Sequence, residues 1–261
     1  MNFTFCAQTD RGRVQENNED SVAFDAATHL GVLADGMGGY NAGEIASSMA
    51  TALIKSELAK CLSEAAQQVN VGQVRRAIEI CVDNTNRSIF NASNANPQYS
   101  GMGTTLVLGI FQGAKLMLGH IGDSRCYRLR GNELLQITRD HSLLQEQMDA
   151  GWLTPEQAAA SPNKNLVTRA LGVEEGVMLE LHEHRVEAGD LYLMCSDGLS
   201  DMVEDAAIAR ILQNEPSLAQ MAAALVALAN KNGGRDNITV LLTQVTDTLE
   251  KRSFLSRWFG K

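Results

Sequence analysis

The chain has 261 residues, of which 44% are hydrophobic and 20% are charged, so it is long and apolar enough to bury a sizeable core. Its 31 acidic residues outnumber its 22 lysines and arginines, which gives a formal net charge of −9. That balance argues against a duplex nucleic-acid binder, because neutralising phosphates requires clustered cations. An acidic chain can still bind a phosphorylated substrate when a metal ion supplies the positive charge.

The cysteines and the apolar stretches of the sequence indicate the cellular compartment of the protein. The five cysteines are odd in number and no two are within three residues of each other, which argues against a disulfide framework or a zinc ribbon. We therefore expect a reducing, cytoplasmic environment. We expect neither a signal peptide nor a transmembrane segment, since no apolar stretch approaches the roughly 20 residues that a membrane helix needs.

Taken in chain order, the hydrophobic patterns predict groups of strands separated by pairs of helices. We expect strands over 3–7, 21–24 and 30–34; helices over 44–61 and 71–91; strands over 104–111, 115–122, 124–130 and 133–138; short helical pieces over 143–150 and 155–160; strands over 178–186 and 191–195; helices over 205–213 and 218–231; and a strand over 238–245. Short turns join most strands, which favours an α+β sandwich of antiparallel sheets with helices outside over a doubly wound parallel α/β sheet.

Acidic residues recur where the predicted strands end, mostly beside glycine. They are Asp20, Asp35, Asp123, Asp197 and Asp236. One Asp-Gly pair alone is an ordinary turn, but strand ends bring residues that are distant in sequence together. Clustered carboxylates repel one another, and a bound divalent cation removes that repulsion. Oxygen-only ligands indicate Mg²⁺ or Mn²⁺ over zinc.

Other catalytic motifs fail on inspection. The glycine-rich run after Asp35 has Asn41 at the third glycine position of a dinucleotide loop. Ser196 is not a GxSxG nucleophile, because Met194 occupies the first glycine position. His141 lies in the run TRDHS (138–142), and we expect a structural role for it.

Seven ordered motifs carry a family resemblance that spans residues 5 to about 245. They are TDRGRVQENNED (9–20), LADGMGG (33–39) with AGEIA (42–46), GMGTT (101–105), GHIGDSR (119–125), TRDHS (138–142), CSDGL (195–199) and GRDNIT (234–239). In these motifs the chain resembles the metal-dependent serine/threonine protein phosphatases of the type 2C (PPM) family, in their compact bacterial form.

The resemblance implies a four-layer sandwich of two stacked antiparallel sheets flanked by helix pairs. It also implies two to three Mn²⁺ or Mg²⁺ ions. Asp35, Asp197 and Asp236 match the first-metal ligands, and Asp35 with the Gly36 carbonyl matches those of the second. Asp20 matches the acid that holds water ligands of the second metal. A third-metal site is implied at Asp123 together with Asp197.

The implied reaction is hydrolysis of phosphoserine and phosphothreonine in proteins by a metal-bridging hydroxide, with Asp20, Asp35, Asp197 and Asp236 as the catalytic set. The substrates would be phosphorylated proteins, targets of a serine/threonine kinase in a signalling pathway. A weakly active phosphate-binding regulatory relative is the alternative, and a different two-metal hydrolase such as a nuclease is less favoured by the charge. Turnover of p-nitrophenyl phosphate with and without Mn²⁺ separates the first two.

One departure concerns the substrate phosphate. Family members usually place an arginine five residues before Asp20, and here that position is Gln15. Arg11, Arg13 and Gln15 are spaced by two, so in an extended segment their side chains share one face. We hypothesise that Arg13 wholly or partly replaces the missing arginine, because its guanidinium offers a planar fork of donors to a phosphate.

The chain outside these motifs divides into a flap and a tail. The resemblance places a variable flap over about 144–165, and Thr154–Asn165 reads as a mobile surface segment. With four prolines and no linker, we expect one catalytic domain over residues 1–246. Residues 247–261 form a basic and aromatic tail, which we expect either to pack or to dock a partner or an anionic membrane surface.

Overall fold

The computed structural model describes residues 1–39, 42–64, 71–154, 157–158, 161 and 166–247. The predicted tail therefore lies outside the described residues from 248 onward, and so does most of the predicted helical piece over 155–160. No helix in the described part of the chain is long and apolar enough to cross a membrane.

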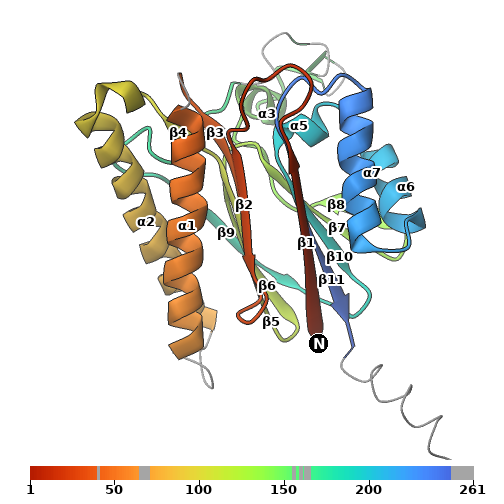
Figure 1. Cartoon of the computed structure of the whole chain (residues 1–261). Helices are drawn as coiled ribbons and strands as arrows, with labels where there is room; N and C mark the ends of the chain where they lie inside the picture. The colour runs from red at the N-terminus through yellow and green to blue at the C-terminus, as the bar shows by residue number, and fades with distance from the viewer. Residues whose placement is uncertain (40–41, 65–70, 155–156, 159–160, 162–165, 248–261) are drawn as a thin grey trace, which may run out of the picture.

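Two antiparallel sheets form the centre of the molecule (Figure 1). The first sheet has the strand order β1 (Asn2–Asp10), β11 (Ile238–Thr246), β10 (Leu191–Cys195), β7 (Arg125–Arg130) and β8 (Glu133–Gln136). The second has the order β2 (Asp20–Asp25), β3 (Leu30–Met37), β5 (Leu106–Gln112), β6 (Lys115–Ile121) and β9 (Glu180–Arg185), with β4 (Gly103–Thr104) paired to β3. The short turns between most of these strands explain the antiparallel pairing.

A pair of long helices covers the outer face of each sheet (Figure 1). The helices α1 (Ala42–Glu64) and α2 (Val71–Ala95) lie against the second sheet, and α6 (Asp205–Asn214) and α7 (Leu218–Lys231) lie against the first. The other helices whose bounds the structure describes are short: η1 (Pro97–Tyr99), α3 (Leu143–Asp149) and α5 (Asp197–Ser200). The expected four-layer sandwich is confirmed.

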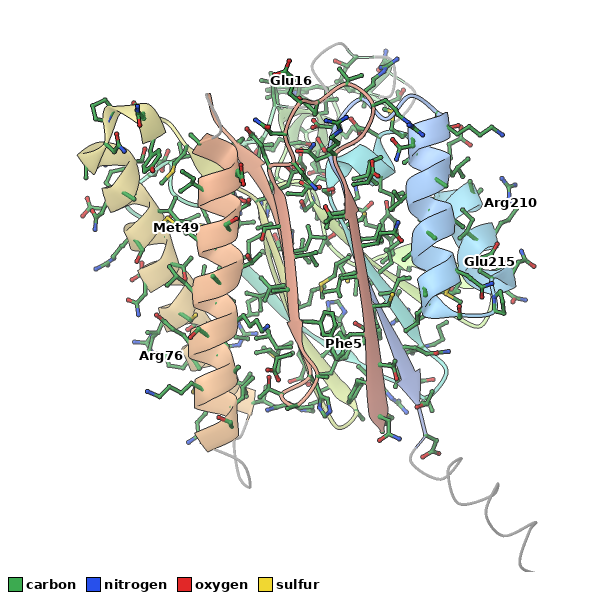
Figure 2. All side chains as sticks on the ribbon, viewed as in Figure 1. Phe5, Glu16, Met49, Arg76, Arg210 and Glu215 are labelled. Carbon is green, nitrogen blue, oxygen red and sulfur yellow. The ribbon has the colours of Figure 1, made fainter. Side chains whose placement is uncertain are left out.

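Three hydrophobic clusters hold the layers together. One lies between the second sheet and α1 and α2, and another between the first sheet and α6 and α7. The third fills the space between the sheets, where Phe111 and Tyr192 are fully buried. Phe5 from β1 joins this layer and stacks on Phe24, with ring centroids 5.5 Å apart (Figure 2). Apolar burial on both faces of the strands makes each sheet a rigid platform.

The segment before β2 differs from expectation. Residues 12–14 form a turn rather than an extended strand, so the argument that Arg11, Arg13 and Gln15 share one strand face is wrong. Gly12 has a φ of +80°, and its N–H donates to Asp10 Oδ1 at 2.9 Å, which closes the turn. A side chain at Gly12 would begin 2.2 Å from the Asp236 carbonyl oxygen, so only glycine allows this loop to lie against β11.

Candidate active site

The five aspartates predicted from strand ends meet at one end of the sandwich. Asp20 at the start of β2 pairs directly with Asp35 on β3 across the antiparallel ladder. Asp123 follows β6, Asp197 follows β10, and Asp236 precedes β11. Because the strands run antiparallel, the end of one lies beside the start of the next, and the five carboxylates come together.

Asp20 is held from the first sheet. Ser196 Oγ donates to Asp20 Oδ2 at 2.7 Å, and the same hydroxyl accepts from the Thr239 N–H at 3.0 Å. The other carboxylate oxygen, Oδ1, is buried without a hydrogen-bond partner among the described residues. A buried acceptor without a partner is costly, so Asp20 presents an oxygen that fits a cation or its bound water.

The Asp35–Gly36 step is fixed by its backbone. The Asp35 N–H donates to Thr105 Oγ1 at 3.0 Å, and the Asp35 carbonyl accepts from Thr105 N–H and Thr104 Oγ1, both at 2.8 Å. A side chain at Gly36 would begin 2.2 Å from the Gly43 carbonyl oxygen and 2.5 Å from that of Glu19. Only glycine therefore allows α1 and the loop before β2 to close around this strand end.

Asp236 is oriented by the loop that precedes β2. Its Oδ1 accepts from the Gln15 amide at 2.9 Å and from the Asn237 N–H at 2.8 Å. Asn237 in turn holds the loop, because its side chain donates to the carbonyls of Arg11 and Asn17 and accepts from the Glu19 N–H at 2.7 Å. Gln15 thus touches a predicted metal ligand.

Burial and mutual repulsion dominate the electrostatics of these carboxylates, and the Arg125 guanidinium opposes the effect only weakly at Asp123. Burial, with the neighbouring Asp20 and Asp197 carboxylates, raises the pKa of Asp35 well above its ordinary value. Burial also raises the pKa of Asp197 well above the ordinary range, and Asp123 and Asp236 add to the effect. The pKa values of Asp20 and Asp123 are raised to about 6, mainly by burial. A divalent cation would stabilise the charged form of all five.

A pocket of about 500 Å³ opens over Asp35, Gly36, Asp123, Asp197 and Asp236. Among the described residues that line it, none is a lysine, an arginine or a histidine. Figure 2 shows Glu16, which also lines the pocket, at the same end of the molecule. An all-oxygen donor set with no internal cation fits Mg²⁺ or Mn²⁺.

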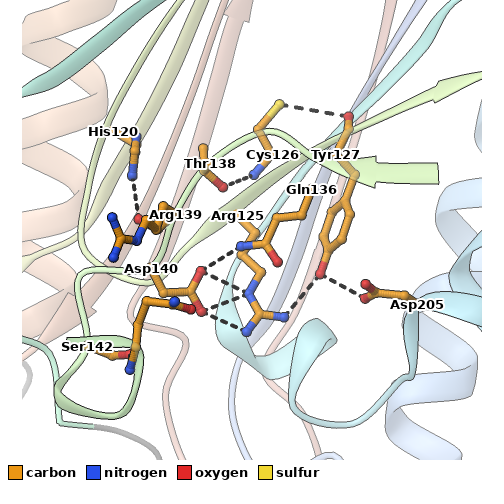
Figure 3. A network of polar contacts seen from close by, with 11 residues as sticks. His120, Arg125, Cys126, Tyr127, Gln136, Thr138, Arg139, Asp140, Ser142 and Asp205 are labelled. Atoms are coloured by element: carbon orange, nitrogen blue, oxygen red, sulfur yellow. Dashed lines mark hydrogen bonds and ion pairs between the residues drawn. The ribbon is translucent and has the colours of Figure 1, made fainter. Parts of the chain in front are cut away.

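Two networks of polar contacts lie beside Asp123. In the first, Arg125 binds both oxygens of Asp140, with Nε–Oδ1 at 3.1 Å and Nη2–Oδ2 at 2.7 Å (Figure 3). Arg125 also donates to the hydroxyl of Tyr127, which donates to Asp205 at 3.1 Å (Figure 3). The start of β7 is thereby tied to the start of α6.

In the second network, His141 holds the residue before Asp123. Its backbone N–H donates to the Gly122 carbonyl at 2.9 Å, and its Nδ1 accepts from the Gly122 N–H at 3.1 Å. Its Nε2 lies 3.1 Å from Glu180 Oε2. Both ring nitrogens are thus engaged, an arrangement that supports the expected structural role.

The two candidate phosphate contacts lie differently. Gln15 lines the pocket, whereas Arg13 is exposed and is not among the described lining residues. The Arg13 N–H is bound to the Gly234 carbonyl at 2.7 Å, which anchors the turn. Sequence reasoning assigned no role to Ser196, Thr105 or Asn237. Ser196 and Asn237 each stand beside an aspartate in the motifs, and that adjacency was the available signal, whereas Thr105 has no acidic neighbour in sequence.

Comparison with known proteins agrees with this site. The profile of the family described as Protein phosphatase 2C matches residues 7–244. The serine/threonine protein phosphatase PstP of Mycobacterium tuberculosis is 43% identical over 244 residues, which are 93% of this chain and 45% of PstP, so the chain spans about half of that relative. The serine/threonine phosphatase Stp of Listeria monocytogenes is 36% identical over 91% of this chain and 94% of its own.

A solved structure shows the same architecture. The catalytic domain of PstP, in complex with 2 manganese ions, superposes with a TM-score of 0.80 at 41% identity, covering 94% of this chain and 99% of that one. The matching fold, the matched motifs and the acidic pocket lead to one assignment. The chain belongs to the protein phosphatase 2C family.

Proposed function

We propose that the chain is a protein serine/threonine phosphatase that requires Mn²⁺ or Mg²⁺. The observation that carries the proposal is a pocket lined by four of the five aspartates, with the buried Asp20 paired to Asp35 beside it, whose described lining has no cationic side chain. A phosphate monoester could not approach such a surface without bound cations, since like charges repel. The relatives named as serine/threonine phosphatases, and the manganese ions of PstP, support the same activity.

The residues divide the work as follows. Asp35, Asp197 and Asp236 would hold one cation, Asp35 with the Gly36 carbonyl a second, and Asp20 would hold water around it. When bound, the cations neutralise phosphate charge and activate water for in-line attack. A protein nucleophile is unnecessary, in keeping with the cysteines: none is among the described residues that line the pocket, and burial raises the pKa of Cys195 to about 12.

Gln15 is the chain's own candidate for contact with the phosphate. One amide hydrogen binds Asp236 Oδ1, and the second could donate to a phosphate oxygen. A neutral donor binds phosphate less strongly than the fork of an arginine. We therefore infer that cations supply most of the phosphate affinity, and that Arg13 contributes only if the turn over 12–14 reorients.

The test uses the full chain stripped of metal with a chelator. Release of phosphate from a phosphothreonine peptide and from p-nitrophenyl phosphate should be negligible, and Mn²⁺ or Mg²⁺ should restore both. Full turnover after stripping would contradict the metal requirement. Failure of every cation to restore turnover would favour the weakly active regulatory relative.

Three finer assignments belong to the same proposal. A third cation is proposed at Asp123 and Asp197, which line both the acidic pocket and a neighbouring cavity of about 310 Å³. A cytoplasmic signalling role, opposing a serine/threonine kinase, follows from the substrate class and from the cysteines. Docking of a partner or membrane by residues 247–261 rests on their sequence alone.

A further inference from the structure

A further cavity, of about 360 Å³, adjoins the acidic pocket and differs from it in character. Met37 and Val167 line both, so the two are continuous. This further cavity is also lined by Val173, Val177 and Met178, and its charged lining residues, Arg169 and Glu174, are of opposite sign. The Met178 side chain is 70% exposed and Val173 is 50% exposed, which leaves apolar surface open to solvent beside the catalytic residues. Exposed apolar clusters of this kind mark interaction sites.

The loop that carries these residues is held in place from beneath. Asn86, fully buried on α2, accepts from the Gly172 N–H at 2.7 Å and donates to the carbonyls of Glu174 and Glu175 at 3.0 and 3.1 Å. Leu171 forms a two-way backbone bridge with Thr104. A buried side chain that makes three bonds to one loop fixes its shape, so the exposed apolar residues are preorganised.

The floor of the cavity depends on a glycine, Gly103, which has no side chain to occupy the space. A side chain at Gly103 would begin 2.7 Å from Val173 Cγ2 and 3.6 Å from Met37 Cγ. Glycine at this position lets the valine and the methionine, from different parts of the chain, lie over β4. Together they form one apolar surface that extends from the acidic pocket.

We propose that this cavity receives an apolar side chain of the phosphoprotein, flanking the phosphorylated residue. The inference rests on the proposed function. It follows from continuity: a peptide whose phosphate lies over the aspartates and that extends past Met37 and Val167 meets a preformed surface on which most lining residues are apolar. Burial of a leucine there stabilises the complex.

The test is a panel of phosphothreonine peptides in which one leucine is moved through the flanking positions of an otherwise alanine-rich sequence. With the Mn²⁺-loaded full chain, we expect leucine at one or two positions to raise kcat/KM about three- to tenfold over the parent, mainly through KM. The ratio of leucine peptide to parent peptide is the readout, so a general change in turnover cancels.

Met178→Glu should reduce that ratio to near one, and the milder Met178→Ser should lower it in the same direction. Ile80→Glu adds the same charge on α2 at a residue that is 46% exposed, and should leave the ratio unchanged.

Equal turnover of all peptides by the unmodified chain would overturn the cavity's role while leaving the phosphatase proposal intact. Absence of turnover with any phosphopeptide would contradict the proposed function itself. If the leucine-to-parent ratio were unchanged in Met178→Glu, the cavity would not be the leucine site. If Met178→Glu changed only the molecular mass of the protein in solution, the surface would instead be a contact between copies of this chain.

Discussion

Strand β10 has an aspartate at each end, and the surroundings of the two differ in sign. Asp190, just before the strand, is fully buried and accepts from Arg130 Nε and Nη2 at 2.7 and 2.8 Å. It also accepts from the Glu187 N–H and the Tyr192 hydroxyl. Burial alone would raise the pKa of Asp190, but these donors hold it below its ordinary value.

Asp197, just after the strand, has other carboxylates as its charged neighbours. Burial, followed by Asp123 and Asp236, raises its pKa well above the ordinary value. The difference separates a structural aspartate from a functional one. Where the chain supplies the cation, the carboxylate stabilises the fold, and where it does not, the carboxylate is available to an ion from solution.

The largest expected effect is on activity, through Asp197→Asn. Removing one charged ligand should lower kcat/KM with Mn²⁺ on the order of 100-fold or more, because the cations carry the chemistry. The melting temperature of the metal-free protein should stay the same or rise, since mutual repulsion falls. Turnover and thermal unfolding, measured together, check this, and Asp236→Asn is the matched variant. Near-normal turnover in both variants would mean that Asp197 and Asp236 are not needed for activity.

The reciprocal change, Asp190→Asn, should affect stability and not chemistry. It leaves Arg130, whose side chain is 30% exposed, without its main partner. We expect a loss of about 2 kcal/mol in unfolding free energy, or roughly 5 °C in melting temperature, discounted for that exposure. Turnover at 25 °C should be retained. A variant that lost activity without losing stability would show that this end of the strand reaches the site.

The third effect concerns pH and metal together. In the metal-free chain the pKa values of Asp20 and Asp123 are raised to about 6, so folding favours their protonated forms. Their contribution is complete below the unfolded pKa near 4 and is lost as pH rises through about 6. Asp190 acts oppositely, because its lowered pKa makes its contribution present at higher pH and lost as pH falls.

Melting temperatures measured between pH 5 and pH 8 test this balance. The metal-free protein should become less stable across that range, and Mn²⁺ at about 100 times its dissociation constant should restore about 2.7 kcal/mol. A flat profile without metal would mean that the acidic cluster has found counter-charges within the chain.

The smallest expected effect is that of Gln15→Arg. The new guanidinium should lower KM for a phosphopeptide several-fold, because a charge-assisted fork replaces a neutral amide. The kcat should change less. If KM and the Mn²⁺ concentration needed for activity both rose, the new arginine would be pairing with Asp236 instead of the phosphate. Asp236 would then be neutralised by the chain itself, as Asp190 is by Arg130.

Much of this protein follows from local sequence alone. The two-residue and helical periods predicted the strands and the helix pairs, since burial of one face requires those patterns. The five aspartates were identified because strand ends beside glycine are local features. Even the antiparallel arrangement followed from the short turns.

Tertiary contacts decided the rest. The turn over residues 12–14 forms because Gly12 packs against the Asp236 carbonyl and Arg13 bonds to Gly234, partners more than 200 residues away. The four-residue helix α5 is too short to show a period, so it went unpredicted. Asn86 and the loop that it holds meet only when α2 packs on the second sheet. No local pattern encodes such contacts, because each depends on two distant segments that only the assembled core brings into register.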